Sequence, residues 1–302
     1  MGPSESLNAV VGAPPAIRLM GVLNVTPDSF SDGGRFLDVG AAVEHGRELI
    51  RQGADIVDIG GESTRPGAEP VSAEEELARV APVIEGLAGR PEGVGISIDT
   101  SKAEVARAAI EAGADFVNDV SALRADPAMA ELVAASGAEC CLMHMLGEPR
   151  TMQRGGGPQY GDVVEEVGAF LSERLEFAVG AGVARERILL DPGIGFGKTV
   201  EHNLELLRRL DELCALGAPI VIGSSRKGFI GRVTADARGQ DEPVGMSERL
   251  AGTIATNVLA LERGARVFRV HDVGAVGDAL ALATATLTGR WTARNATTTR
   301  TS

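Results

Sequence analysis

The chain has 302 residues, of which 44% are hydrophobic and 3% aromatic, and its formal net charge at pH 7 is −13. So acidic a chain lacks the basic face with which proteins bind the nucleic-acid backbone, although it can still hold a local basic pocket for a small anion. No apolar run approaches the roughly 20 residues that cross a membrane. We therefore expect neither nucleic acid nor a membrane among its partners.

The two ends of the chain are expected to lie outside the folded domain. Residues 1–16 are rich in Pro, Ala and Ser and lack the segments of a signal peptide, and residues 291–302 are rich in Thr and Arg. We predict a single domain over residues 17–290 between two disordered tails. The three cysteines have no metal-ligand spacing, which favours reduced thiols in a cytoplasmic protein.

Short apolar runs alternate with longer segments of helical period, which is typical of β–α units with parallel strands. Eight such units fit a closed barrel better than an open sheet. The predicted fold is therefore a (β/α)8 TIM barrel, an eight-stranded parallel barrel with outer helices. The predicted strands are, in chain order, 19–23, 56–59, 94–98, 116–117, 140–143, 188–190, 220–222 and 267–270.

Capping signals mark the predicted helix ends. Ser72 and Ser101 are each followed three residues later by a glutamate, the spacing of a capping box, and Asp126 precedes a proline at a predicted first helical position. Glycine ends a helix easily because it adopts the left-handed conformation without strain. We predict that role for Gly53, Gly113, Gly137, Gly217 and Gly264.

Most connections from helix to strand are short, so the spare length falls after the strands. The long connections are 24–40, 61–72, 144–161, 191–199 and 224–247. In a barrel they share the rim where catalytic residues collect, whereas tolerated surface loops would lengthen both ends. The acidic, Gly-rich part at 234–246 has no clear pattern, and one interpretation is a disordered insertion.

Polar residues follow almost every predicted strand, which predicts a ring of them around one mouth of the barrel. A single member of such a ring is explained equally well as a helix cap or a turn residue. Taken together, Asp99, Asn118 and Asp191 can pair with the donor and acceptor edge of a planar heterocycle. The ring contains Asn24, Asp58, Glu62, Asp99, Asn118, His144, Asp191, Ser224, Arg269 and His271.

A basic cluster follows the last two predicted strands, where barrels frequently bind phosphate. It consists of Arg226, Lys227, Arg269 and His271, and it predicts an anion site; the alternative is ordinary surface charge. The segment 191–199 lacks the spacing of a phosphate-binding P-loop. The four histidines show no metal-binding spacing, and no serine occupies a nucleophile elbow.

Eight collinear motifs between about Leu19 and Leu287 resemble the dihydropteroate synthase family. They are MGVLNVTPDSFSDGG (20–34), DIGGESTRPGA (58–68), SIDTSK (97–102), VNDVSA (117–122), MHM (143–145), LDPGIGFGKT (190–199), SRKGFIG (225–231) and FRVHDV (268–273). The resemblance implies a folate-pathway transferase that joins a dihydropterin diphosphate to p-aminobenzoate and that sulfonamides inhibit. It also implies a homodimer, formed by late helices such as the Ala-rich segment 273–287.

The same resemblance implies roles for individual residues. The metal ligand would be Asn24, holding Mg²⁺ on the diphosphate. The pterin would contact Thr64, Asp99, Asn118, Asp191 and Lys227, with Met143 and Phe196 beside the substrates. The diphosphate would contact Arg269 and His271, with Val270 between them. The aminobenzoate pocket would use Phe30, Thr64, Arg65, Pro66 and Lys227.

The resemblance, together with the lack of an obvious protein nucleophile, favours departure of the diphosphate before the amine attacks, and it implies Asp99, Lys227, Arg269 and His271 as catalytic residues. Two alternatives remain from the sequence. A pterin-dependent methyltransferase module would use the same Asp and Asn ring without the basic cluster. A paralogue of the family would bind pterin without turnover.

Overall fold

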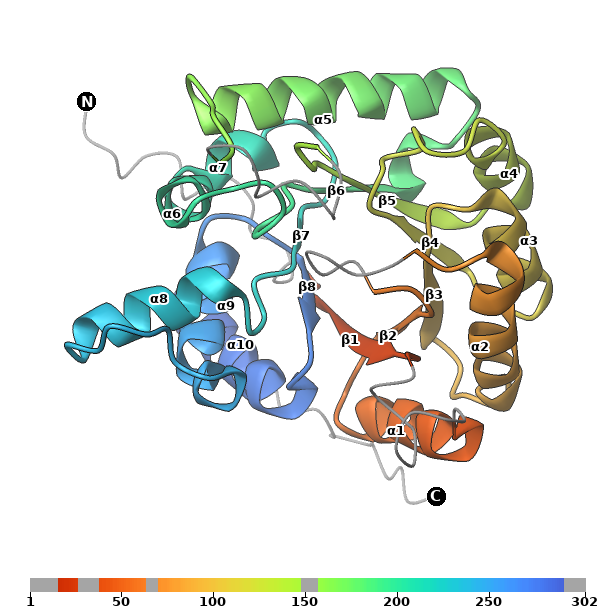
Figure 1. Cartoon of the computed structure of the whole chain (residues 1–302), viewed down its shortest axis with the longest axis horizontal. Helices are drawn as coiled ribbons and strands as arrows, with labels where there is room; N and C mark the ends of the chain where they lie inside the picture. Colours follow the sequence, from red (N-terminus) through yellow and green to blue (C-terminus); the bar gives the residue numbers. More distant parts are fainter. Residues whose placement is uncertain (1–15, 27–37, 64–69, 148–156, 291–302) are drawn as a thin grey trace, which may run out of the picture.

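The computed structural model describes residues 16–26, 38–63, 70–147 and 157–290, which form a barrel of eight parallel strands (Figure 1). The strand order is β6-β5-β4-β3-β2-β1-β8-β7, and a bridge between Leu190 and Ile220 joins the two outermost members. This confirms the predicted TIM barrel. The strands are β1 Arg18–Asn24, β2 Ile56–Gly60, β3 Gly95–Asp99, β4 Phe116–Asp119, β5 Glu139–Met143, β6 Ile188–Asp191, β7 Val221–Ile222 and β8 Val267–Val270.

Helices surround the barrel, and two of the β–α connections carry an additional helix (Figure 1). These additional helices lie between β6 and β7 and between β7 and β8. The helices are α1 Val39–Arg51, α2 Ala73–Gly86, α3 Ala103–Glu111, α4 Met129–Ser136, α5 Val163–Gly180, α6 Val200–Arg208, α7 Leu210–Cys214, α8 Gly228–Ala237, α9 Leu250–Glu262 and α10 Val273–Thr288.

The barrel is filled by one inward-facing layer of side chains, and a larger core lies between strands and helices. The inner layer consists of Met20, Ile56, Phe116, Cys141, Leu189, Val221 and Val267. The outer core is almost entirely aliphatic, as the composition predicts. Because successive residues of a strand face opposite sides, the residues two positions beyond this layer also point inward, at the carboxyl ends of the strands. The sequence therefore directs polar side chains into one mouth.

The helix starts confirm one capping prediction and correct two. Ser72 accepts a hydrogen bond from the backbone N–H of Glu75 at 3.1 Å, as predicted, but the Glu75 carboxylate pairs with Arg79 and does not complete the capping box. Ser101 does not cap α3; that helix begins at Ala103, whose N–H donates to the Asp126 carboxylate at 2.8 Å. An oxygen from the next β–α loop thus replaces the local cap. The helix predicted to begin just after Asp126 begins two residues later, at Met129.

The predicted helix-ending glycines all have positive φ, between 69° at Gly137 and 110° at Gly113. The interpretation of 234–246 as a disordered insertion is wrong. Helix α8 runs to Ala237, and the backbone oxygen of Val244 accepts two hydrogen bonds from Arg249, at 3.0 and 2.8 Å. A third bond from the same guanidinium reaches the backbone oxygen of Arg226 at 2.9 Å. Arg249 therefore ties this segment to the loop that follows β7.

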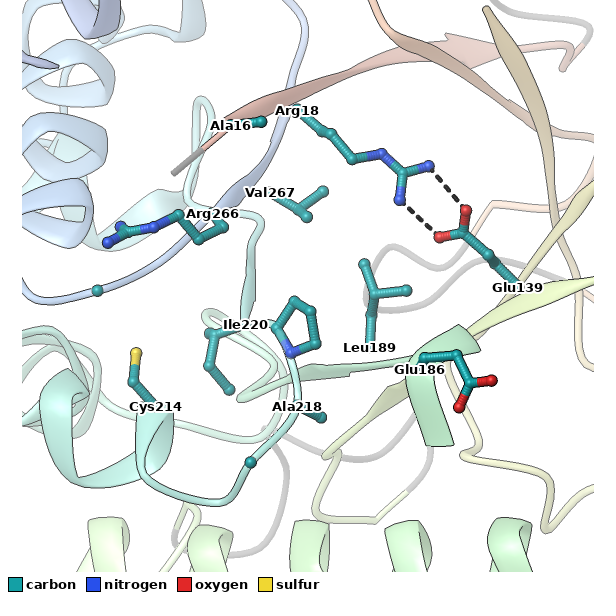
Figure 2. A pocket seen from close by; sticks show the side chains of 13 residues that line it. Ala16, Arg18, Glu139, Glu186, Leu189, Cys214, Ala218, Ile220, Arg266 and Val267 are labelled. Carbon is teal, nitrogen blue, oxygen red and sulfur yellow. Dashed lines mark hydrogen bonds and ion pairs between the residues drawn. The ribbon is translucent and has the colours of Figure 1, made fainter. Parts of the chain in front are cut away.

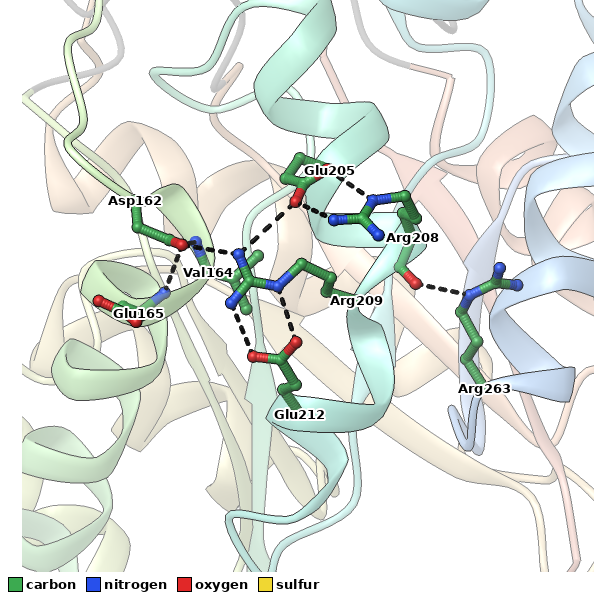
Figure 3. Close-up of polar contacts among 8 residues, drawn as sticks. All are labelled: Asp162, Val164, Glu165, Glu205, Arg208, Arg209, Glu212 and Arg263. Carbon is green, nitrogen blue, oxygen red and sulfur yellow. Dashed lines mark hydrogen bonds and ion pairs between the residues drawn. The ribbon is translucent and has the colours of Figure 1, made fainter. Parts of the chain in front are cut away.

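An ion network on the outer surface joins α5, α6 and α7 (Figure 3). Arg209 donates to Asp162 at 2.7 Å and to both oxygens of Glu212 at 2.7 and 2.8 Å. Arg263, just after α9, donates to the backbone oxygen of Arg208 at 2.9 Å. Exposed pairs contribute only about 0–1 kcal/mol each, so the network fixes helix positions more than it stabilises the fold.

Two observations concern the environment of the chain. Among the described residues, no helix is long and apolar enough to span a membrane. Cys140 and Cys141 are buried and Cys214 is partly buried, and all three are free thiols. Burial raises the pKa of Cys140 to about 12 and that of Cys214 to about 11, so both remain protonated at neutral pH. This agrees with the expectation of reduced thiols.

Candidate active site

Most of the predicted polar ring lies at the mouth formed by the carboxyl ends of the strands, whereas the side chains of His144 and Ser224 contact the outer helices at Phe170 and Thr256. The alternation set by the inner layer directs inward Asn24, Asp58, Asp99, Asn118, Met143, Asp191 and Arg269. Val270 is different, because its fully buried side chain belongs to the outer core. Only the backbone of Val270 can therefore reach a ligand in the mouth.

Arg269 is the centre of a buried network across the mouth. Its Nε donates to Asp58 at 2.6 Å, and its Nη2 donates to Asp99 at 2.7 Å. The Asn118 amide donates to the same oxygen of Asp58 at 3.2 Å. The sequence places Asp58 in the polar ring but assigns it no individual partner. One oxygen of Asp58, Oδ1, is buried without a hydrogen-bond partner among the described residues.

Burial dominates the electrostatics of this network. It raises the pKa of Asp99 to about 7; Asp58 raises that pKa further, while Arg269 opposes the shift. Burial also lowers the pKa of Arg269, but Asp58 and Asp99 outweigh burial and hold it above its ordinary value. Arg269 is thus a permanent cation beside a carboxyl group that titrates near neutral pH.

Asp191, at the end of β6, both orders its own turn and faces the mouth of the barrel. Its Oδ1 accepts a hydrogen bond from the N–H of Gly193 at 2.7 Å, so it does hold its own turn. Its Oδ2 lies 3.8 Å from the position that a Cβ would take on Gly223, so this glycine keeps space beside the carboxylate. Burial raises the pKa of Asp191, and Lys227 and Arg269 act against that shift.

The loop after β7 and the end of β8 meet, as predicted, but they carry less free positive charge than predicted. Arg226 is paired with both oxygens of Asp272, at 2.5 and 3.0 Å. The Ser225 hydroxyl lies 3.0 Å from Nδ1 of His271. Burial, together with nearby Arg269 and Arg226, lowers the pKa of His271 to about 4. His271 is therefore neutral near pH 7 and can serve as a hydrogen-bond partner.

Lys227 lies on the face of an aromatic ring at the mouth. Its Nζ is 3.9 Å from the ring centroid of Phe196, a cation–π geometry. The ring packs with Met143 and Met145 in a small separate cluster. Gly195 permits this arrangement, because a Cβ there would lie 2.9 Å from Cδ of Lys227. The structure thus brings together Met143, Phe196 and Lys227.

Four predicted site residues, Phe30, Thr64, Arg65 and Pro66, lie outside the described residues. Among the described residues, no group of three His, Cys, Asp or Glu side chains could hold a metal ion. Asn24 is partly exposed at the end of β1 and offers a carboxamide oxygen. That donor fits Mg²⁺, which usually takes few protein ligands and keeps water and phosphate oxygens.

A cavity of about 470 Å³ lies at the opposite end of the barrel, where the strands begin (Figure 2). Its lining includes Arg18, Glu139 and Val267, and Arg18 and Glu139 form a two-bond ion pair of 2.6 and 3.2 Å. This end of a barrel serves stability, while catalysis belongs to the other end. The buried network of Arg269 accordingly marks the candidate site.

Comparison with protein families shows what class of protein this barrel and mouth belong to. Residues 20–271 match the family model described as "Pterin binding enzyme". That span runs from within β1 to just after β8 and so includes the carboxyl ends of all eight strands. The chain therefore belongs to the family of pterin-binding enzymes.

Individual relatives narrow the class. Dihydropteroate synthase of Escherichia coli K12 is 47% identical over 272 residues, which cover 90% of this chain and 92% of that protein. The structure of Xanthomonas albilineans dihydropteroate synthase with 4-aminobenzoic acid has a TM-score of 0.81 and 48% identity, covering 90% and 93%. A Yersinia pestis dihydropteroate synthase complex with a sulfonamide drug has a TM-score of 0.82 and 41% identity, covering 92% and 96%. Within the family, the chain is a transferase of the dihydropteroate synthase group.

Proposed function

We propose that the mouth of this barrel joins (7,8-dihydropterin-6-yl)methyl diphosphate to p-aminobenzoate, releasing diphosphate and 7,8-dihydropteroate. The observation that carries the proposal is the buried network of Arg269, Asp58, Asp99 and Asn118 at the carboxyl ends of the strands. Within one site, this network provides carboxylates that can bind a heterocycle and a cation that can bind an anion. The synthase relatives support this reaction over a methyltransferase module or a silent paralogue.

The pterin ring is assigned to Asp99, Asn118 and Asp191, with Thr64 and Lys227 alongside. A carboxylate can accept two parallel hydrogen bonds from an aminopyrimidine edge, which requires the ionised form. The position of Asn118, held by Asp58, supports its use as an oriented amide. Met143 and Phe196 provide the apolar walls beside the flat ring.

The diphosphate is assigned to Arg269 and His271, with Mg²⁺ held by Asn24. When the bond between the methylene carbon and the diphosphate oxygen breaks, its electron pair leaves with the diphosphate. The carbon becomes a cation conjugated to the dihydropterin, which the carboxylates Asp99 and Asp191 stabilise. Bound Mg²⁺ would supply charge neutralisation to the leaving group. Arg269 and a hydrogen bond from His271 do the same from the protein side.

The aminobenzoate is assigned to Phe30, Thr64, Arg65 and Pro66 together with Lys227. Its amine nitrogen attacks the methylene cation and then loses one proton, which balances the substitution. A relative is named as binding 4-aminobenzoic acid and another as binding a sulfonamide drug, and we propose both ligand classes for this chain. The cation–π contact between Lys227 and Phe196 supports a boundary between the two substrate pockets here.

Two further expectations belong to this proposal. We propose a homodimer, because α9 and α10, which pack on each other, expose Leu250, Leu259, Leu282 and Leu287. A cytoplasmic location is consistent with the protonated free thiols.

The deciding experiment measures diphosphate release from purified protein with both substrates and Mg²⁺. We expect release that depends on p-aminobenzoate, together with formation of 7,8-dihydropteroate. Folded protein that releases no diphosphate in response to p-aminobenzoate would refute the proposed function. Transfer of a methyl group from a methylated pterin to a corrinoid would instead support the methyltransferase alternative.

A further inference from the structure

Lys198 is a buried lysine at the mouth that none of the roles above uses. It lies between β6 and α6, and only 4% of its surface is exposed. Its Nζ is 3.0 Å from Nδ1 of His144, 3.0 Å from the backbone oxygen of Phe196 and 3.5 Å from the backbone oxygen of His144. Within the described residues, no carboxylate forms an ion pair with this ammonium group.

The contacts of Lys198 hold the turn that follows β6 against the end of β5. Gly193, with φ +68°, is pressed so close to the backbone oxygen of His144 that a Cβ there would lie only 1.8 Å away. The same turn contains the N–H that orients Asp191 and the ring of Phe196 that lies against Lys227. Lys198 thus joins the end of β5 to the segment that positions two of the proposed pterin contacts.

The charge of Lys198 depends on its surroundings. Burial lowers its pKa to about 7; Lys227 lowers it further, whereas Asp191 raises it. Burial and Lys198 lower the pKa of His144 to about 3, so this imidazole stays neutral and accepts from the ammonium group. Around the pair of Lys198 and His144, the titratable groups are Asp191 from β6, Lys227 just before α8, and Arg124 and Tyr160 near the His144 ring.

We propose that Lys198 is a positioning residue for the pterin half of the site. Its ammonium group holds the turn 191–196 against the end of β5 and supports the ionised carboxylate of Asp191. This role rests on the proposed function, because it requires that Asp191 accept hydrogen bonds from the pterin ring.

The proposed role predicts the direction in which pterin affinity changes with pH. Pterin binding requires ionised Asp191, and protonated Lys198 favours that ionisation, so the complex favours protonated Lys198. Affinity for a pterin should therefore fall as pH rises through the pKa of Lys198. Asp99 contributes in the opposite direction, because it must lose a proton before it can accept from the pterin. A comparison of variants at each pH separates the two effects.

The experiment measures binding of 6-hydroxymethylpterin to the full chain between pH 6 and 9. Lys198→Met removes the charge and the hydrogen bonds, and Lys198→Arg keeps a charge at every pH. Arg208→Met is the matched control, since it removes an exposed cation on α6 away from the mouth. We expect Lys198→Met to weaken binding at pH 6 about tenfold, the factor for one pKa unit of interaction. The difference between the unaltered chain and Lys198→Met should shrink toward pH 9, and Arg208→Met should match the unaltered chain.

A second readout follows the proton directly. The chain has only three lysines, at positions 102, 198 and 227, so selective ¹³C labelling of lysine gives three side-chain signals. The signal that Lys198→Met removes should titrate far below the ordinary range of lysine, and Lys198→Arg should lack the alkaline loss of affinity.

Three results would overturn the proposal. One is a folded Lys198→Met protein that binds pterin as the unaltered chain does at every pH. Another is loss of folding in both Lys198 variants, which would make the residue purely structural. An unaltered chain that binds no pterin would overturn both this role and the proposed function, whereas the first two results leave the proposed function intact.

Discussion

Both ends of the barrel carry an arginine paired with carboxylate, and the pairs have similar geometry. At the mouth, Arg269 donates to Asp58 and Asp99 at 2.6 and 2.7 Å; at the other end, Arg18 donates to Glu139 at 2.6 Å. Their burial differs. The Asp58 side chain is 0% exposed and that of Asp99 is 10% exposed, whereas Arg18 and Glu139 are each about one-third exposed. Water therefore screens the second pair more strongly than the first.

This contrast teaches that burial, more than the presence of an ion pair, distinguishes the functional end. A buried pair leaves an uncompensated charge when one partner is removed, whereas an exposed pair leaves a solvated group. Burial raises the pKa of Asp99 to about 7, which is a direct effect of the buried environment at the mouth. Perturbed groups of this kind cluster at functional sites.

The largest effect is expected for Arg269→Met. The change leaves Asp58 buried without its cation, which should cost about 3–5 kcal/mol in the free energy of unfolding. It also removes a cation from the leaving group, so kcat should fall by about 10²–10³. Urea unfolding and diphosphate release measure the two effects. Near-normal turnover in the folded variant would contradict the assignment of Arg269.

A change in pH should come next in size and should move activity and stability in opposite directions. Activity requires ionised Asp99, so kcat/KM should fall about tenfold per pH unit below pH 7. The folded state holds the Asp99 proton more tightly than the unfolded chain does. From this group alone, stability is therefore highest at low pH and decreases as pH rises from about 4 to about 7. Asp99→Asn should abolish both dependences, and an unchanged acid limb in that variant would assign the limb to another group.

Asp58→Asn should have an intermediate effect. The amide keeps the shape of the carboxylate, and its oxygen can still accept from Asn118 and Arg269, but it places less negative charge against Arg269. We expect a loss of about 1–3 kcal/mol in unfolding free energy, the range for a disturbed buried hydrogen bond. Pterin affinity should fall along with stability, because the neutral amide oxygen is a weaker acceptor for Asn118 and Arg269. Normal pterin affinity in Asp58→Asn would show that the negative charge of Asp58 is not needed to orient Asn118.

Arg18→Met should have the smallest effect. The pair with Glu139 is exposed, so unfolding free energy should change by less than about 1 kcal/mol and kcat/KM should stay within twofold. The same two assays used for Arg269→Met apply here. A loss of activity in this variant would mean that the cavity at the far end of the barrel influences catalysis.

The sequence predicted most of the fold because it depends on periodicity and local signals. All eight strands were located within one or two residues, and the helix-ending glycines were recognised. The cap of α3 was mispredicted because its oxygen comes from Asp126, more than twenty residues away in the chain. The spacing of residues along one segment cannot indicate a partner that lies so far away in the chain.

The sequence also predicts which residues face the candidate site, but not how they pair with one another. Strand-end position identified Asp99, Asn118, Asp191 and Arg269, because alternation along each strand decides which side chains face inward. It could not reveal that Asp58 pairs with Arg269, since the two residues are 211 positions apart in the sequence. Nor could it give the charge of His271, which depends on burial and on neighbours from other strands.

The pairing of Arg269 with two carboxylates also bears on which anions the enzyme admits. A small ion such as phosphate or sulfate would reach an arginine whose charge Asp58 and Asp99 already neutralise. Its binding would displace these carboxylates, and the ion provides no other group for them to bind. A pterin diphosphate brings both parts: hydrogen-bond donors for Asp99 and an anion for Arg269. With the proposed contacts, exchange of partners within one ligand would therefore let the site discriminate its substrate from the simple anions of its surroundings without closing the mouth to them.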